Sequence, residues 1–146
     1  MKKNIIIVII LAVIIVILVL FLLLPKPVQS PSQNNSQILP GIQVLSPKPN
    51  DVISSPLKIT GYVNGNGWIG FEGQVGTVHL LDKDGKELSV IYLPATTEWT
   101  ALPTNFEANL EFTATPGTPG SLVFKNENAS GDPERDKTFT IPIKFK

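Results

Sequence analysis

The stretch NFEANLEFT, residues 105–113, alternates apolar and polar side chains at every second position. Its four apolar residues fall on one face of an extended strand: Phe106, Ala108, Leu110 and Phe112. A period of two is typical of a half-buried β-strand, whereas helical spacing would scatter these residues around the helix. The sequence therefore predicts a strand over residues 105–113, with one face in a hydrophobic core.

Six further segments carry strand signals, at residues 42–45, 57–63, 74–81, 86–93, 121–125 and 137–146. Asp84-Gly85 predicts a hairpin turn between the third and fourth of them, because glycine accepts positive φ and aspartate caps its own turn. Pro142 lies in the last segment and has no N–H to donate to a ladder. We therefore expect that strand to lie at a sheet edge or to leave this position unpaired.

About seven short strands, separated by turn clusters and without an intervening helix, predict an all-β immunoglobulin-like β-sandwich over residues 41–146. The chain has no cysteine, so burial alone must stabilise this domain. The expected core consists of Ile42, Val44, Leu57, Ile59, Val75, Leu80, Leu88, Ile91, Phe106, Leu110, Phe112, Leu122, Phe124, Phe139, Ile141 and Ile143.

An unbroken apolar run from Ile5 to Leu24 precedes the domain. A helix of about 20 residues spans the hydrocarbon layer of a bilayer, which is about 30 Å thick. Lys2 and Lys3 place the N-terminus in the cytoplasm by the positive-inside rule, and the domain outside it. We therefore predict that residues 1–24 form a single-pass transmembrane helix in the lipid bilayer of the cell membrane. A cleaved signal peptide is the alternative, although such peptides have shorter apolar cores and a small-residue cleavage site.

The segment between anchor and domain, residues 25–40, reads PKPVQSPSQNNSQILP. Its richness in Pro, Ser, Gln and Asn predicts a disordered linker that holds the domain away from the bilayer. Residues 41–146 contain nine basic and twelve acidic residues, a net charge of −3. This balance argues against nucleic acid as a partner, because a nucleic-acid-binding surface must neutralise phosphates.

Two stretches, IQVLSPKPNDVISSPLKITGYV at residues 42–63 and FEGQVGTVHLLDKDGKEL at residues 71–88, together resemble the Gmad2 family. The family is known as an immunoglobulin-like domain of bacterial spore germination proteins. The matching features are Ser46-Pro47, Ser55-Pro56 leading into Ile59-Thr60-Gly61, Phe71-Glu72, the turn at residues 82–85, and Phe106 with Gly120 downstream. The resemblance implies an extracytoplasmic sandwich that works as an accessory module, and it brings no catalytic residues with it.

Catalytic chemistry has few candidates in this chain. His79 is the only histidine, and its place in a predicted strand favours an ordinary sheet position over a triad or a metal site. The acidic loop at residues 132–136 is a weak calcium candidate. A glycoside hydrolase would need paired carboxylates in a cleft, from among Glu72, Glu98, Glu107 and Glu111. We expect no catalytic residue, no cofactor and no metal, and hence no enzyme.

Three aromatic residues, Tyr62, Trp68 and Trp99, are the candidate ligand-binding residues. Tryptophan in a loop either packs across the end of a sandwich or offers a stacking surface to a ligand. Our leading hypothesis is a membrane-tethered, non-catalytic interaction or accessory module of the bacterial cell envelope, with an envelope protein or glycan as partner. The alternative is a carbohydrate- or peptidoglycan-binding module that uses these aromatics, and an envelope hydrolase ranks third.

Overall fold

The computed structural model describes residues 41–146, and the predicted membrane anchor and linker at residues 1–40 lie outside the described residues. Within the described range, no helix has the length and hydropathy needed to cross a membrane. The elements in chain order are β1 (Ile42–Ser46), β2 (Val52–Ile53), β3 (Leu57–Val63), β4 (Gln74–Asp82), β5 (Glu87–Pro94), β6 (Thr104–Leu110), β7 (Pro119–Asn126), the short 3-10 helix η1 (Pro133–Arg135) and β8 (Thr138–Phe145).

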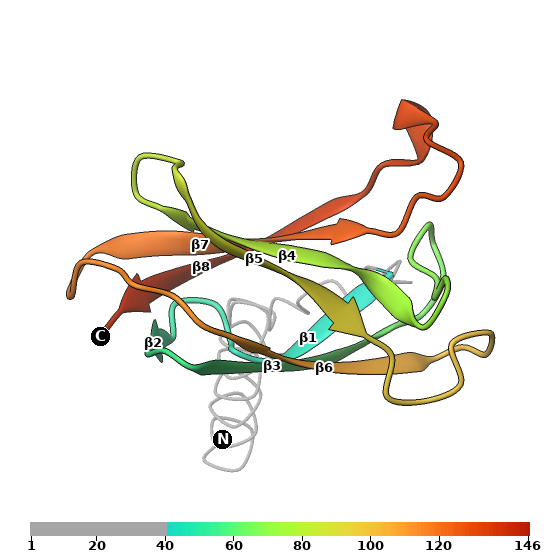
Figure 1. Ribbon diagram of the computed structural model, residues 1–146, viewed down its shortest axis with the longest axis horizontal. Helices are drawn as coiled ribbons and strands as arrows, with labels where there is room; N and C mark the ends of the chain where they lie inside the picture. The colour runs from blue at the N-terminus through green and yellow to red at the C-terminus, as the bar shows by residue number, and fades with distance from the viewer. Residues whose placement is uncertain (1–40) are drawn as a thin grey trace, which may run out of the picture. The chain divides into compact units, whose positions relative to one another are not determined.

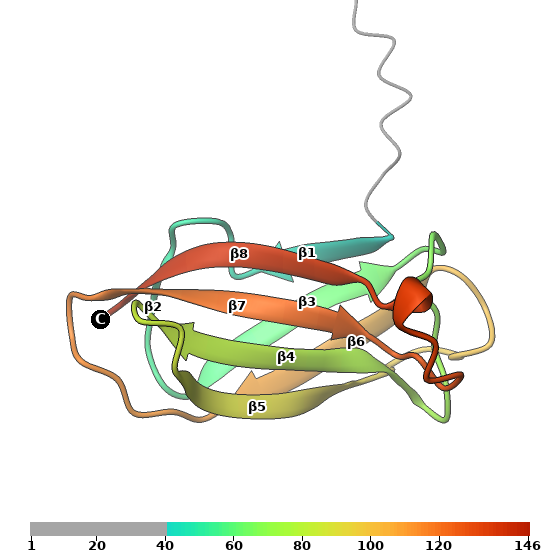
Figure 2. The ribbon, with the colours of Figure 1, turned by 90° about the horizontal axis from the view of Figure 1, so that it is seen from above.

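Two sheets face each other across a hydrophobic core (Figure 1). One sheet has the strand order β1-β3-β6, and the other has the order β2-β8-β7-β4-β5. Figure 2 shows β8, β7, β4 and β5 side by side in front of the smaller sheet. Neighbouring strands run antiparallel, except that the two-residue β2 lies parallel to β8. This is the all-β, immunoglobulin-like, two-sheet arrangement that the alternating pattern predicts.

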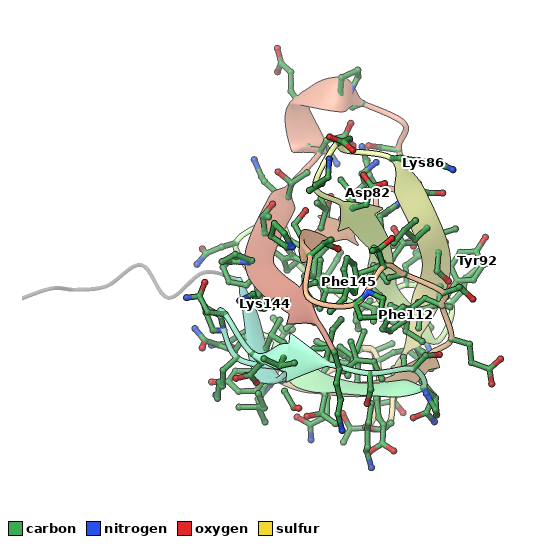
Figure 3. The ribbon with its side chains drawn as sticks, turned by 90° about the vertical axis from the view of Figure 1, so that its left-hand side faces the viewer. Asp82, Lys86, Tyr92, Phe112, Lys144 and Phe145 are labelled. Carbon is green, nitrogen blue, oxygen red and sulfur yellow. The ribbon has the colours of Figure 1, made fainter. Side chains whose placement is uncertain are left out.

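β6 contains most of the predicted strand at residues 105–113 and alternates buried and exposed residues along its whole length. The strand ends at Leu110, three residues before the predicted end. The backbone N–H of Phe112 donates to Ser55 Oγ at 3.0 Å instead of joining a ladder. The Phe112 ring remains half-buried and packs against Phe145, with ring centroids 5.6 Å apart (Figure 3).

The remaining strands follow the predicted segments closely, with two instructive details. The hairpin between β4 and β5 is held by Asp82, whose Oδ1 accepts from the backbone N–H groups of Asp84 and Lys86. The carbonyl of Pro142 points away from β7, toward the β2 side of β8, where it accepts a hydrogen bond from Asn50 N. In an antiparallel ladder the N–H and carbonyl of one residue point to the same side, so the N–H that proline lacks would not have joined the ladder to β7. The sequence does not predict β2, since two residues are too few to show an alternation.

The core is largely the expected one. Val44, Leu88, Ile91, Phe112 and Phe139 are only partly buried, at its margin. The prediction missed seven buried residues: Ile53, Val63, Trp68, Val78, Leu93, Ala108 and Phe145. Four of them lie two residues from a predicted core residue of the same strand, on the face that the alternation already assigns to the core: Val78, Leu93, Ala108 and Phe145. Ile53 in the two-residue β2 and Trp68 in a loop carry no alternation that could have assigned them.

Gly61 lies where β3 passes between β1 and the ring of Phe106. An added Cβ there would sit 2.2 Å from the Gln43 carbonyl oxygen and 2.5 Å from Phe106 Cζ. We expect Gly61→Ala to lower the free energy of unfolding by about 3 kcal/mol, because backbone and ring must both move. The control, Gly85→Ala, meets no atom within 4 Å but has a φ of +80°, and should cost about 1 kcal/mol. Urea denaturation measures the free energy of unfolding of both variants. Equal losses would contradict the close packing of Gly61 against β1 and the Phe106 ring.

Candidate functional site

The three aromatic candidates occupy different environments. Trp68 is 4% exposed and belongs to the core, whereas Trp99 is 37% exposed. Tyr62 is half-buried and lies on the outer face of β3, whose residues alternate between the core and the outer face. The structure therefore does not gather the three rings into one stacking surface.

Trp68 closes one end of the sandwich. Its backbone pairs with Gly65 through two hydrogen bonds of 2.9 and 3.0 Å, around a turn in which Asn66 and Gly67 both have positive φ. The ring packs against Gly41, where an added Cβ would come within 2.7 Å of Trp68 Cδ1. A tryptophan buried in this way offers no ring face to a ligand. Of the two roles considered for a loop tryptophan, Trp68 therefore has the packing role.

Trp99 belongs instead to an exposed apolar surface, which we call the loop patch. It consists of Phe71 and Trp99, each 37% exposed, and the same two loops also contain the exposed residues Ile69 and Leu102. The Phe71 and Trp99 rings meet edge to face, with centroids 6.4 Å apart and planes at 69°. Gly70 allows the two loops to touch, because an added Cβ would lie 2.4 Å from the Trp99 carbonyl oxygen. Sequence reasoning missed three of these four residues, since isolated apolar loop residues carry no periodic signal.

Tight turns hold the Phe71 side of the loop patch in place. Phe71 and Gln74 exchange two backbone hydrogen bonds of 2.8 and 3.0 Å. Between them, Glu72 has a φ of 50° and Gly73 a φ of 85°. A glutamate in the left-handed region is uncommon, and such residues gather where a surface must keep one shape. Figures 1 and 2 both show these loops at the end of the domain where β1 begins.

A second exposed region lies on the outer face of the larger sheet. It is an open groove of about 650 Å³, and Tyr92 of β5 is the aromatic residue that lines it. The Tyr92 side chain is 66% exposed, the highest value among the exposed large hydrophobic residues of the described chain. Sequence reasoning did not select Tyr92, although it selected Tyr62, which also lies on the outer face of a strand.

His79 lies on the same outer face, between Thr77 and Glu87. Its Nδ1 is 2.6 Å from Glu87 Oε2, and its Nε2 is 3.2 Å from Thr77 Oγ1. The order hydroxyl, imidazole and carboxylate is that of a hydrolase triad. However, Thr77 and Val78 are paired with β5 on one side and with β7 on the other, so this backbone lies within the sheet and not in a loop that could present free N–H groups as an oxyanion hole. The arrangement fits the ordinary sheet position expected for His79.

The acidic loops use their carboxylates locally. Asp132 Oδ1 accepts from Glu134 N and caps η1, while Asp136 Oδ1 accepts from Asn128 Nδ2 at 2.7 Å. No group of three or more His, Cys, Asp or Glu side chains within residues 41–146 is arranged to hold a metal ion. At the β4–β5 hairpin, a hydrogen bond to Asp84 and the charge of its carboxylate raise the pKa of Lys83 above its ordinary value.

Two of the four glutamates considered for hydrolysis, Glu98 and Glu107, make separate local contacts. Glu107 forms an ion pair of 2.7 Å with Lys58 on the outer face of the smaller sheet. Glu98 Oε1 accepts from Thr100 Oγ1 at 3.0 Å within its own loop. These contacts do not build the paired-carboxylate cleft that glycoside hydrolysis requires.

Two facing sheets of short, mainly antiparallel strands define the class of this domain as an immunoglobulin-like β-sandwich. Residues 41–144 match the family model of Gmad2, the immunoglobulin-like domain of bacterial spore germination. This match covers more than half of the chain, and the protein belongs to the Gmad2 family. No curated protein and no solved structure matches the chain. The family resemblance found in the sequence is thereby confirmed.

The two tryptophans should respond differently to substitution. We expect Trp68→Ala to lower the free energy of unfolding by about 3–5 kcal/mol, because it empties a buried site. Trp99→Ala should cost less than about 1 kcal/mol, since its ring is partly exposed. Urea denaturation measures the stability, and acrylamide quenching of each single-tryptophan variant measures ring accessibility. Equal quenching of the two rings would contradict the different burial of Trp68 and Trp99.

Proposed function

We propose that this protein is a membrane-tethered accessory module that binds other components of the bacterial envelope outside the cytoplasm, without catalysing a reaction. Membership in the Gmad2 family supports the accessory part, since the family is an immunoglobulin-like domain of bacterial spore germination. The local engagement of His79 and of the acidic loops supports a binding rather than a catalytic activity.

The observation that carries the tethering part is the apolar run at residues 5–24. A run of this length without a charge is long enough for a membrane-spanning helix. Lys2 and Lys3 before it favour a cytoplasmic N-terminus. Residues 41–146 then lie on the far side of the membrane, joined to it by residues 25–40.

The loop patch supports a protein partner. Interfaces have an apolar, aromatic centre within a polar rim, and tryptophan is enriched among the residues that dominate binding. Phe71 and Trp99 form such a centre, and the acidic residues Glu72 and Glu98 lie in the same two loops. The partner surface that fits is apolar at its middle and basic at its edge.

Membrane fractionation tests the tether. We expect the full chain with a C-terminal tag to stay in the membrane pellet after alkaline carbonate extraction. External protease on intact cells or spheroplasts should cut within residues 25–40 and release the tagged domain, because that segment is rich in polar residues and proline. A double variant, Val13→Arg with Leu18→Arg, is the control and should leave the pellet, since each arginine costs about 2.5–3.5 kcal/mol in mid-membrane. Recovery of the unaltered full chain in the soluble fraction would refute the tether.

Photocrosslinking tests the loop patch. A photoreactive phenylalanine analogue in place of Phe71 should give a discrete crosslinked band in cells, because the patch would lie against its partner. The control is the same analogue at Val52, which is 61% exposed on β2. The Phe71 band should disappear when Trp99→Ser is added. Equal bands from both positions would show that the patch contacts no particular partner.

A further inference from the structure

A single row of side chains crosses the outer face of the larger sheet. Tyr92 of β5 is the register partner of Thr77 of β4, and Thr77 is the partner of Lys125 of β7. Lys125 is in turn the partner of Thr138 of β8. We call these four residues the cross-sheet row. Because neighbouring strands lie about 4.8 Å apart, the row is about 14 Å long and runs across the strands rather than along one of them.

The side chains of the cross-sheet row are available to a ligand. Tyr92 projects away from the sandwich, as Figure 3 shows, and most of its surface is exposed. Within residues 41–146, the side chains of Tyr92, Lys125 and Thr138 make no hydrogen bond. Thr77 shares its hydroxyl only with His79. The row therefore combines an open aromatic ring, three hydroxyl groups (those of Thr77, Tyr92 and Thr138) and an ammonium group with unused hydrogen-bonding capacity.

The row lies in the groove of about 650 Å³, whose rim is built from paired polar side chains. Gln74 Nε2 donates to Glu127 Oε2 at 3.1 Å, and Asn128 Nδ2 donates to Asp136 Oδ1 at 2.7 Å. These pairs fix the orientation of amide and carboxylate groups along the rim. Each carboxylate keeps free lone pairs, so the rim can still accept hydrogen bonds from a ligand.

We propose that this groove binds an extended glycan chain. A sugar ring has an apolar C–H face that can lie on the Tyr92 ring, and its edge carries hydroxyl groups that match the threonines and the rim carboxylates and amides. Lys125 adds a point charge for a carboxylate on an acidic sugar or a cell-wall peptide. The site deepens the proposed function, on which it rests, by naming a ligand class for the accessory module.

Other ligands fit the groove less well. One aromatic ring among polar groups is too little apolar surface for the centre of a protein interface. Nucleic acid is disfavoured by the net charge of −3 over residues 41–146. Addition of a peptide strand requires an open sheet edge, but the row crosses the middle of the sheet over β4 and β7, which are paired on both sides.

The test measures retention of the purified full chain on insoluble glycans. The protein is kept in a detergent without a sugar head group, so that the detergent does not compete for the groove. One arm uses peptidoglycan sacculi, which carry carboxylates, and the other uses amorphous cellulose, which is neutral. We expect retention on at least one polymer, and Tyr92→Ala should weaken it about tenfold. Lys125→Met should weaken retention on sacculi and leave retention on cellulose unchanged.

Tyr62→Ala is the matched control, because it removes the other tyrosine of the chain, from the opposite sheet. It should leave retention unchanged, and equal urea midpoints for the variants verify that the fold is intact. Absence of retention on both polymers would overturn the glycan site, as would equal losses from Tyr62→Ala and Tyr92→Ala. If the chain stays in the membrane pellet but binds neither polymer, only the glycan site is refuted. If the chain binds glycan but is recovered as a soluble protein, only the proposed membrane tether is refuted.

Discussion

Burial of one face of every strand is the interaction on which the rest of this domain depends. The chain has no cysteine, so no disulfide joins the sheets, and residues 41–146 show no metal cluster that could do so. The inward residues of β3, β4, β6, β7 and β8 fill the space between the sheets, with no buried side-chain polar atom left unpartnered in the described range. Because this burial uses every second residue, the alternate residues are left on the outer faces, free to serve binding.

Closure of the sandwich ends decides which aromatic residues remain accessible. Trp68 is drawn into the core by a tight turn and by the missing side chain of Gly41. Trp99, in the loop that packs over Gly70, stays partly exposed beside Phe71. The same end of the sandwich therefore contains a buried tryptophan, Trp68, that stabilises the fold, and the loop patch around Trp99, which can contact a partner.

The loop patch and the cross-sheet row are chemically different surfaces of one small domain. The patch is apolar and held by turns, which suits a protein partner, whereas the row is polar with a single exposed ring, which suits a glycan. The proposed tether would strengthen the effect of such a pair, because tethering raises the effective concentration of nearby envelope components. Weak individual contacts can then be sufficient for a specific position in the envelope.

The sequence by itself determined the fold class, the strand locations apart from β2, most of the core and the family, because alternation, turn residues and motif order are local properties of the chain. The apolar run at residues 5–24 also predicts a membrane anchor, which lies outside the residues that the structure describes. Only the tertiary structure decided the fates of Trp68 and Trp99, two loop tryptophans that local sequence does not distinguish. The cross-sheet row could not be predicted either, since its four residues come from four strands. Their meeting depends on the register of three separate ladders, which is set by long-range contacts and not by any local pattern.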